Sequence, residues 1–406
     1  METNMEKIVV MGLGYIGLPT ASMLATKRFQ VTGVDSNEKV VATINSGKIH
    51  IVEPDLDILV RSAVNSGNLK ASSIPEEADV FILAVPTPFK ATETNPKAPD
   101  ISYVEAATNA IIPYIKEGNL IILESTSPVG TTERIHNQIV SNRPELSEKI
   151  FVTHCPERVL PGRILRELVD NDRIIGGINP VSAEKAKNLY QTFCSGNIFL
   201  TDSKTAEMAK LVENSFRDVN IAFANELSII SEKLGINVWE LISLANKHPR
   251  VNILSPGPGV GGHCIAVDPW FIVDSVPNEA RLIRTAREVN DHKPHWVVEK
   301  IRSKASRFKN PVIGCLGLAF KANIDDLRES PALEITRELI AGGIGEVMAC
   351  EPNIGNRFSE FPLYSLEDVL MKADIIVVLV DHKQFRTINK ERLKEKIIID
   401  TRGIIN

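Results

Sequence analysis

The sequence predicts an α/β protein in which two Rossmann-like, doubly wound domains are joined by a long central helix. A short apolar strand runs into a glycine-rich turn at the start of the chain, Thr205 to Leu234 contain no proline or glycine, and apolar strands alternate with helical patterns again after residue 306. The chain has 406 residues, more than a single hydrophobic core normally serves. We therefore expect three parts, residues 1–200, 201–305 and 306–406.

The composition narrows the class of protein. Hydrophobic residues make up 43% of the chain and charged residues 24%, as in a typical soluble globular protein. The net charge of −5 provides no basic field for nucleic acid or an anionic membrane surface. The polar start METNMEK has no signal-peptide core, and the longest apolar runs, such as Ile375–Val380, are far too short to span a membrane. We therefore expect a cytoplasmic protein. Five scattered cysteines without a CxxC pair argue against disulfides and against a metal site.

The first strand, Lys7–Met11, leads into the motif Gly12-x-Gly14-x-x-Gly17 at the start of a helix. Gly12 permits a tight turn, Gly14 lets the backbone approach a pyrophosphate, and Gly17 lets the helix pack on its strand. The helix N-terminus also favours the negative charge of a phosphate. This pattern predicts dinucleotide binding.

A second strand, Gln30–Val34, ends in Asp35, at about the spacing that the glycine motif requires. The Asp35 carboxylate can accept hydrogen bonds from a ribose diol, and its charge would repel a 2′-phosphate. We therefore predict that the cofactor is NAD in preference to NADP.

Two further strands, Asp79–Val85 and Asn119–Glu124, run into loops rich in hydroxyl residues and proline. Ligands of open parallel sheets lie beyond the carboxyl ends of the strands, which places Thr87 and Thr126 at the cofactor crevice. Threonine and proline also mark turns for purely structural reasons, and position alone does not separate these two interpretations.

The next strand, Lys149–Thr153, precedes the segment HCPERVLPGR. This segment brings Glu157, Arg158 and Arg163 to the same kind of loop. A last strand, Asn197–Leu200, closes the first domain near residue 200.

Residues 205–234 predict one helix of about 30 residues, roughly 45 Å long. Lys210, Asn214 and Arg217 stand at positions i, i+4 and i+7 and so form one polar stripe. Such a stripe is usually a solvated face, but apolar residues that recur beside it favour a helix buried between domains, with the stripe facing a cleft. Those apolar residues are Met208, Leu211, Val212, Phe216, Val219 and Phe223.

A shorter helix, Asn237–Asn246, and the segment KHPR lead into the loop Ser255–Phe271, which reads SPGPGVGGHCIAVDPWF. Its glycines and prolines exclude a helix and leave backbone amides open to an anion. The loop carries Cys264 and Asp268. A lone cysteine is more often an inert buried thiol, so a reactive role for Cys264 depends on the rest of the chain.

A helix over Glu279–Ser306 leads to a second α/β unit, which begins with the strand and glycine-bearing turn of Pro311–Lys321. This unit faintly repeats the start of the chain but lacks a complete GxGxxG motif, so we predict that it binds a different nucleotide. Arg328 and Arg402 lie at element ends suited to a phosphate, although exposed arginines are more often solvated. Its other expected elements are the strands Glu346–Cys350, Asp374–Val380 and Lys396–Thr401 and the helices Ala332–Ala341 and Leu366–Met371.

Taken in order, seven motifs resemble those of the UDP-glucose/GDP-mannose dehydrogenase family along essentially the whole chain. They are GLGYIGLPTA, VPTP, ESTSPVGTT, CPERVLPGR, AKLVENSFRDVNIAFANE, GVGGHCIAVDPWF and GLAFKANIDDLRES. The resemblance implies a four-electron oxidation of a nucleotide sugar at C6 to a carboxylate, with two NAD and one water. The segments GGHCIAVDPWF and CPERVLPG most resemble members that act on UDP-N-acetyl-D-mannosamine, with UDP-N-acetylglucosamine as the second choice and UDP-glucose as the third.

The resemblance also implies catalytic roles. Lys210 and Asn214 would help the C6 hydroxyl lose its proton, directly or through a water held by Asp268. Cys264, as thiolate, would attack the aldehyde to give a thiohemiacetal and then a thioester. Glu157 would activate the water that hydrolyses this thioester, and the Lys210 ammonium would stabilise the oxyanions.

Binding residues follow from the same resemblance. It also implies a homodimer with the long helix as the dimer core, or a higher homo-oligomer. One departure concerns Pro161, which stands where UDP-glucose dehydrogenases have a second glutamate four residues after the position of Glu157. We expect His263 to be structural or to shape the sugar site. The implied NAD residues are Gly12, Gly14, Tyr15, Ile16, Gly17, Asp35, Thr87, Thr126 and Arg328, and the implied UDP-sugar residues are Arg158, Val159, Lys210, Asn214, Arg217, His248, Arg250, Gly261, Phe320, Lys321 and Arg402. In relatives the position of Arg250 reaches the site of a neighbouring subunit.

Two alternatives of other classes stay open. A two-electron hydroxyacid-type dehydrogenase would share the Lys-x-x-x-Asn helix but has no use for Cys264. A non-catalytic sensor of nucleotide sugars would not need Lys210, Asn214, Cys264 and Asp268 together.

Overall fold

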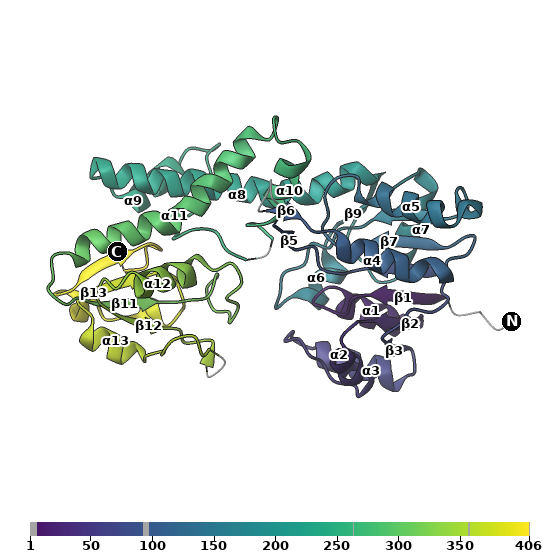
Figure 1. The fold of residues 1–406 in the computed structure, drawn as a ribbon, viewed down its shortest axis with the longest axis horizontal. Coiled ribbons are helices and arrows are strands. Elements are labelled where there is room, and N and C mark those ends of the chain that lie inside the picture. The colour runs from purple at the N-terminus through teal and green to yellow at the C-terminus, as the bar shows by residue number, and fades with distance from the viewer. Residues whose placement is uncertain (1–5, 92–96, 263, 356–357, 406) are drawn as a thin grey trace. The chain divides into compact units, whose positions relative to one another are not determined.

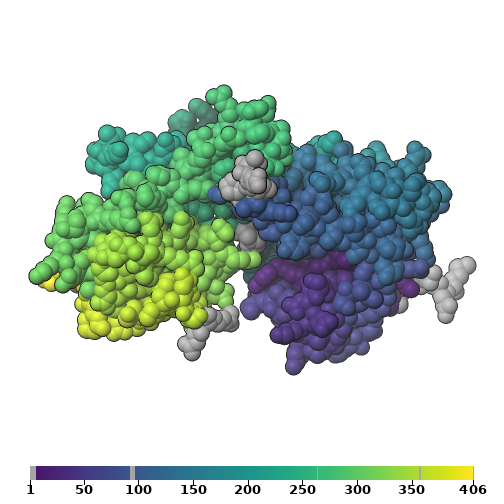
Figure 2. Space-filling model, in the orientation of Figure 1, coloured from purple at the N-terminus to yellow at the C-terminus, as the bar shows by residue number. Residues whose placement is uncertain are grey.

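The structure is a computed structural model that describes residues 6–91, 97–262, 264–355 and 358–405. The chain divides into two compact units, Met1–Val212 and Glu213–Asn406. Figure 1 shows the elements of each unit, and Figure 2 shows the surface in the same orientation, with the residues outside the described ranges in grey. Each unit contains a twisted, largely parallel sheet with helices on both faces, which confirms the predicted fold class.

The sheet of the first unit has eight strands in the order β10-β9-β8-β7-β4-β1-β2-β3. The six strands from β3 to β8 follow the Rossmann order, and the switch point lies between β1 and β4. Strand β9 pairs antiparallel to β8, and the other neighbours pair parallel. The strands are β1 Lys7–Met11, β2 Gln30–Val34, β3 Leu69–Ser72, β4 Val80–Leu83, β7 Leu120–Leu123, β8 Phe151–His154, β9 Arg173–Gly177 and β10 Ile198–Asp202, and a separate two-stranded ribbon consists of β5 Phe89–Lys90 and β6 Ala98–Pro99.

Alternate residues of each central strand enter cores on opposite faces of this sheet. Ile8 and Val10 pack with α1, α3 and α7, whereas Val9 and Met11 pack with α4 and α5. The helices are α1 Gly17–Thr26, α2 Glu38–Asn45, α3 Leu56–Asn65, α4 Ser102–Ile111, α5 Thr131–Asn142, α6 Ile164–Asp170 and α7 Pro180–Tyr190, with short 3₁₀ helices at Ile112–Tyr114 and Pro144–Leu146.

The second unit repeats this arrangement with a four-stranded parallel sheet in the order β12-β11-β13-β14. Cys315 packs with α11 and α12 on one face, and Leu316 packs with α13 on the other. The strands are β11 Val312–Leu316, β12 Glu346–Cys350, β13 Ile375–Val378 and β14 Ile397–Asp400, and the helices are α9 Val238–Ala245, α10 Asp268–Ser275, α11 Arg281–Ala305, α12 Pro331–Ala341 and α13 Leu366–Lys372, with 3₁₀ turns at Phe385–Thr387 and Lys390–Leu393.

The long predicted helix is α8, Ser203–Leu234, and the boundary between the two units falls within it. Asp202 begins it by accepting the backbone N–H of Thr205 at 2.9 Å, and Gly235, with φ of +68°, ends it. The predicted apolar face is only partly covered, since Phe216 and Phe223 are 67% and 52% exposed.

The structure differs from the sequence prediction at three places. Strand β3 was not predicted because its residues LKAS are short and include an exposed lysine, and β9 was not predicted because RIIGG ends in two glycines. The loop expected to reach Phe271 ends earlier, since α10 begins at Asp268 and takes Pro269 in its first turn. Among the described residues, no helix has the length and apolar character needed to span a membrane.

Candidate active site

The glycine turn after β1 has the geometry that a pyrophosphate requires. Gly12 has φ of +91°, and a Cβ atom there would lie 2.7 Å from the Ala84 carbonyl oxygen. A Cβ on Gly17 would lie 1.8 Å from the Gly12 oxygen, so the start of α1 can sit this close only without a side chain. A Cβ on Gly14 would meet no atom within 4 Å, and that exposed position is open to a ligand.

Asp35 is held at the end of β2 beside this turn. Its Oδ2 accepts the N–H of Leu13 at 3.1 Å, and its Oδ1 accepts the N–H of Asn37 at 2.9 Å. The carboxylate is half-buried and retains lone pairs for a ribose diol. Tyr15 is exposed and Ile16 half-buried at the entry to α1. These residues fit NAD.

Thr87 and Thr126, predicted at the same crevice, contact each other. The Thr87 hydroxyl donates to the Thr126 carbonyl oxygen at 2.6 Å. They lie in the loops after β4, which borders the switch point, and after β7, the next strand of the sheet. Their contact with the cofactor stays a prediction.

Glu157, in the loop after β8, is part of a buried ion pair that the sequence did not reveal. Its Oε1 accepts the N–H of Arg158 at 2.7 Å, and its Oε2 lies 3.1 Å from Nη1 of Arg173. Both side chains of the ion pair are only 5% exposed. Arg173 begins β9, whose antiparallel pairing with β8 brings it to Glu157 across 16 residues of sequence.

Arg173 is fixed by further contacts. Its Nη2 donates to the Leu168 carbonyl oxygen at 3.1 Å, and its guanidinium carbon lies 4.7 Å from the centre of the Tyr190 ring. The Tyr190 hydroxyl donates to Oε1 of Glu124 at 2.6 Å. Burial, with a smaller contribution from the charge of Glu157, raises the pKa of Glu124 to about 7. Two carboxylates and one guanidinium therefore share this buried cluster.

Lys210 lies on α8 and is half-buried. Burial, with a smaller contribution from the charge of Lys210, lowers the pKa of His154, the last residue of β8, to about 3. The Lys210 ammonium thus acts on the carboxyl end of the strand that leads to Glu157.

In the second unit, α8 and α10 bring together two residues predicted to act in catalysis. Nδ2 of Asn214 donates to Oδ2 of Asp268 at 2.5 Å, and the two residues are 7% and 3% exposed. The N–H of Asp268 in turn donates to the Cys264 carbonyl oxygen at 2.8 Å. Cys264 is an exposed residue and forms no disulfide.

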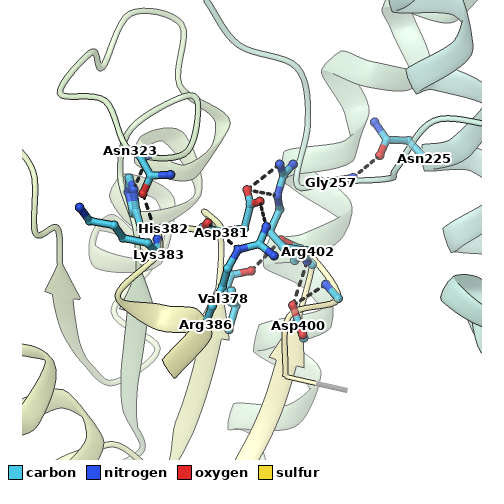
Figure 3. Close-up of polar contacts among 12 residues, drawn as sticks. Asn225, Gly257, Asn323, Val378, Asp381, His382, Lys383, Arg386, Asp400 and Arg402 are labelled. Atoms are coloured by element: carbon cyan, nitrogen blue, oxygen red, sulfur yellow. Dashed lines mark hydrogen bonds and ion pairs between the residues drawn. The ribbon is translucent and has the colours of Figure 1, made fainter. Parts of the chain in front are cut away.

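Arg402 lies beyond β14 and reaches the loop that carries Cys264 (Figure 3). Its Nε and Nη2 donate to Oδ1 of Asp381 at 3.0 and 2.8 Å. A Cβ atom on Gly257 would lie 2.6 Å from Nη1 of Arg402. The N–H of Gly257 donates to Oδ1 of Asn225 at 2.8 Å. Asp381 therefore orients the Arg402 guanidinium, and the missing side chain of Gly257 leaves room for it.

The turn after β11 lies against the same loop. A Cβ on Gly261 would lie 2.8 Å from Cβ of Phe320, and one on Gly262 would lie 2.9 Å from the Phe320 ring. The next residue, Lys321, is exposed. The two glycines before residue 263 thus allow Phe320 to approach the backbone.

Most of the remaining predicted ligand residues are exposed. Nδ1 of His248 accepts the N–H of Arg250 at 3.3 Å, and both residues are exposed, as is Arg217 on α8. Arg328, predicted for NAD, belongs to the second unit and pairs with Asp326. Val159 is half-buried and Arg163 is exposed, and His263 lies outside the described residues.

Models of one protein family match almost the whole chain. The family is described as the UDP-glucose/GDP-mannose dehydrogenase family. Its NAD binding domain matches residues 6–194, its central domain residues 204–292, and its UDP binding domain residues 314–406.

Individual proteins and a solved structure also match almost the whole chain. An NDP-N-acetyl-D-galactosaminuronic acid dehydrogenase of Ralstonia nicotianae is 57% identical over 415 residues, which cover 100% of this chain and 97% of the relative. A UDP-N-acetyl-D-mannosamine dehydrogenase of Campylobacter jejuni is 55% identical over 402 residues, 96% of this chain and 98% of the relative. The solved structure of a UDP-D-ManNAc dehydrogenase from Pyrococcus horikoshii superposes with a TM-score of 0.89 at 42% identity, covering 98% of this chain and 96% of that one.

These matches agree with the structure, which has a glycine turn beside Asp35 in the first unit and a second α/β unit after it. The chain belongs to the UDP-glucose/GDP-mannose dehydrogenase family, with an NAD binding domain at its N-terminal end and a UDP binding domain at its C-terminal end.

Proposed function

We propose that this enzyme oxidises the C6 hydroxyl of UDP-N-acetyl-D-mannosamine to a carboxylate in two NAD-dependent steps. The observation that carries the proposal is the position of Cys264 on a glycine-rich loop, where its carbonyl oxygen accepts the N–H of Asp268, which in turn pairs with the buried Asn214. Relatives named for UDP-N-acetyl-D-mannosamine, at 53–55% identity, support the choice of sugar.

The first step removes a proton and a hydride from C6. Bound NAD supplies the hydride acceptor. The amide of Asn214 donates through Nδ2 to Asp268. The Oδ1 of Asn214 then serves as an acceptor for the substrate hydroxyl or a water. Lys210, one helical turn earlier on α8, receives the hydroxyl proton or stabilises the alkoxide.

The second stage uses the thiol. The Cys264 thiolate forms a C–S bond to the aldehyde carbon, and the carbonyl oxygen takes a proton, which gives a thiohemiacetal. Transfer of a second hydride from this carbon to a second NAD, with loss of the hydroxyl proton, gives a thioester. Water then adds to the thioester carbon, the C–S bond breaks, and the products are the carboxylate and the regenerated thiolate. The covalent link also retains the reactive aldehyde.

Glu157 is the proposed base for the attacking water. Its carboxylate oxygens are oriented by Nη1 of Arg173 at 3.1 Å and by the N–H of Arg158 at 2.7 Å. Because Pro161 occupies the position of the second glutamate of UDP-glucose dehydrogenases, Glu157 is the carboxylate that this loop supplies.

The test is the yield of NADH and uronate for Cys264→Ala. We expect formation of the acid to be abolished, because no thioester can form, whereas Cys194→Ala, which alters a half-buried cysteine of the first unit, should behave as wild type. Acid formation by Cys264→Ala at the wild-type rate would contradict the thioester mechanism.

A second candidate substrate has a specific observation in its favour. The relative at 57% identity is named for an NDP-N-acetyl-D-galactosaminuronic acid. The two sugars are separated by measuring NADH formed per mole of UDP-N-acetylmannosamine, UDP-N-acetylgalactosamine, UDP-N-acetylglucosamine and UDP-glucose. We expect two NADH per sugar for UDP-N-acetylmannosamine alone. The same stoichiometry with another sugar alone would reassign the substrate.

We also propose that the enzyme is a homodimer assembled through α8. Phe216, Phe223 and Ile230 recur every seven residues along this helix and are 67%, 52% and 45% exposed. A second copy related by a two-fold axis would cover this stripe with its own.

A further inference from the structure

The turn after β11 in the second unit repeats the glycine turn after β1 in the first. Gly317 has φ of +95° where Gly12 has +91°. The N–H of Gly12 donates to the carbonyl of Val34, the last residue of β2, at 2.7 Å, and the N–H of Gly317 donates to Cys350, the last residue of β12, at 2.9 Å. The two turns are therefore equivalent in backbone geometry.

The acidic residue beside each turn is also equivalent. Leu13 and Leu318 follow the two glycines, and each donates its N–H to the acid that ends the neighbouring strand. Leu13 donates to Oδ2 of Asp35 at 3.1 Å, and Leu318 donates to Oε2 of Glu351 at 2.8 Å. Glu351 thus occupies in the second unit the place that Asp35 holds at the NAD site.

The two acids differ in what surrounds them. Asp35 is half-buried, whereas the side chains of Glu351 and of its partner His382 are both 0% exposed. Oε2 of Glu351 also accepts the N–H of Ala319 and lies 3.0 Å from Nε2 of His382. Although burial alone would raise the pKa of Glu351, the hydrogen bonds from His382 and Leu318 lower it overall. An acid enclosed in this way has no free face for a ribose.

His382 connects Asn323, at the end of this turn, to Glu351. Its Nδ1 accepts the N–H of Asn323 at 2.9 Å, so its other nitrogen carries the hydrogen that Glu351 accepts. Asn323 has φ of +62°, and its Oδ1 accepts the N–H of Lys383 at 2.9 Å (Figure 3). Glu351 and His382 together hold residues 318–323 at both ends.

The segment held in this way carries two predicted substrate residues, Phe320 and Lys321. Phe320 lies against Gly261 and Gly262, so closely that a Cβ on either glycine would lie within 3 Å of it. Cys264 follows two residues later. A shift of the segment would therefore be transmitted to the backbone that carries the thiol.

We propose that Glu351 and His382 are positioning residues for the UDP-sugar site. The acid that binds ribose in the first unit is turned inward in the second, where it sets the position of Phe320 and, through it, of the glycines before Cys264. The part of this inference that concerns Cys264 rests on the proposed function, whereas the part that concerns the UDP site does not.

The experiment measures UDP affinity by titration calorimetry for His382→Ala, with His295→Ala, an exposed histidine on α11, as the matched control. We expect His382→Ala to weaken UDP binding about tenfold, to leave NAD binding unchanged, and to alter the rate at which iodoacetamide alkylates Cys264. UDP affinity within twofold of wild type in a folded variant would overturn the proposal. UDP carries no sugar, so the result does not depend on which sugar is oxidised.

If His382→Ala does not fold, a second pair of variants tests whether Glu351 and His382 position the UDP site. His382→Gln retains a side-chain N–H for Glu351 and should bind UDP nearly as wild type does. Glu351→Gln offers a single acceptor oxygen in place of a carboxylate that receives donors from Leu318, Ala319 and His382, and should bind UDP more weakly. Equal UDP affinity of Glu351→Gln and wild type would overturn the proposal.

Discussion

At the scale of single residues, the Glu157–Arg173 pair decides how the proposed water-activating base is held. Both groups are removed from water, and a buried ion left without its partner is strongly destabilised. The guanidinium also orients one carboxylate oxygen, while the Arg158 N–H holds the other. In the proposed reaction Arg173 therefore acts through Glu157.

Replacing Arg173 by methionine should slow hydrolysis of the thioester, because Glu157 loses both its charge partner and its orientation. We expect kcat to fall about 10- to 100-fold with little change in the KM for the UDP-sugar. Intact-protein mass spectrometry of quenched reactions should show the sugar retained on Cys264. Arg173→Lys keeps the charge and should recover part of the rate. An unchanged kcat in a folded Arg173→Met variant would refute this role.

Glu124 should make stability depend on pH. Its pKa is about 7 in the folded protein against an ordinary value of 4.5, so the native state binds this proton more tightly than the unfolded chain does. Its contribution to stability is complete below pH 4.5 and is lost as the pH rises through about 7, on the order of 3 kcal/mol in total.

The measurement is the Tm of wild type and of Glu124→Gln between pH 5 and 8. Wild type should lose more Tm over this range than the variant, since glutamine does not titrate and can still accept from Tyr190. Parallel pH profiles for the two proteins would show that Glu124 does not titrate as described.

At the scale of elements, the loop that carries Cys264 is held by buried polar groups on α8 and α11. Asn225 accepts the N–H of Gly257 and donates to Oδ1 of Asn290 at 2.8 Å. Asn290 in turn donates to Asp218, which pairs with Arg287 at 2.6 Å. A loop rich in glycine is thereby fixed through its backbone and without a side chain of its own.

Gly257→Ala should disturb this loop through Arg402. The backbone of Gly257 lies outside the left-handed region, so alanine adds no strain there, but its Cβ would lie 2.6 Å from Nη1 of a guanidinium that Asp381 holds. We expect the KM for the UDP-sugar to rise about tenfold while Tm changes little. A double-mutant cycle with Arg402→Ala is the control, because the alanine should have little further effect once the guanidinium is gone. Additive effects would refute the clash.

At the scale of the whole molecule, two α/β units with similar folds bind different ligands, NAD in the first and UDP in the second. In the NAD binding domain the acid beside the glycine turn is half-exposed, and in the UDP binding domain the equivalent acid is enclosed. A repeated fold therefore presents different chemistry at equivalent positions, because the function depends on what surrounds each site.

The proposed dimer is tested on the exposed stripe of α8. Phe216→Asp should convert a dimer to a monomer in sedimentation equilibrium, because it places a charge in a face that a second copy would bury. Leu282→Asp is the matched control, since Leu282 is 70% exposed and lies on α11. A monomeric wild type, or a Phe216→Asp variant that remains dimeric, would contradict assembly through this stripe.

Local sequence patterns predicted most strands of both sheets, the long helix and the first nucleotide site, but not β3, β9 or the start of α10. Strand Lys7–Met11, the glycine turn, Asp35 and the uninterrupted helix before Gly235 depend on residues within a few turns of one another, so local patterns suffice to predict them. The family followed from the order of such local motifs.

Which buried groups meet depends on the tertiary structure. Arg173 reaches Glu157 because β9 runs antiparallel to β8, and His382 reaches Glu351 because β13 and β12 both flank β11. Neither pairing has a signature in the sequence, since the partners are 16 and 31 residues apart and are joined only by the order of the strands. Sheet topology is a property of the whole chain, and these pairs depend on it.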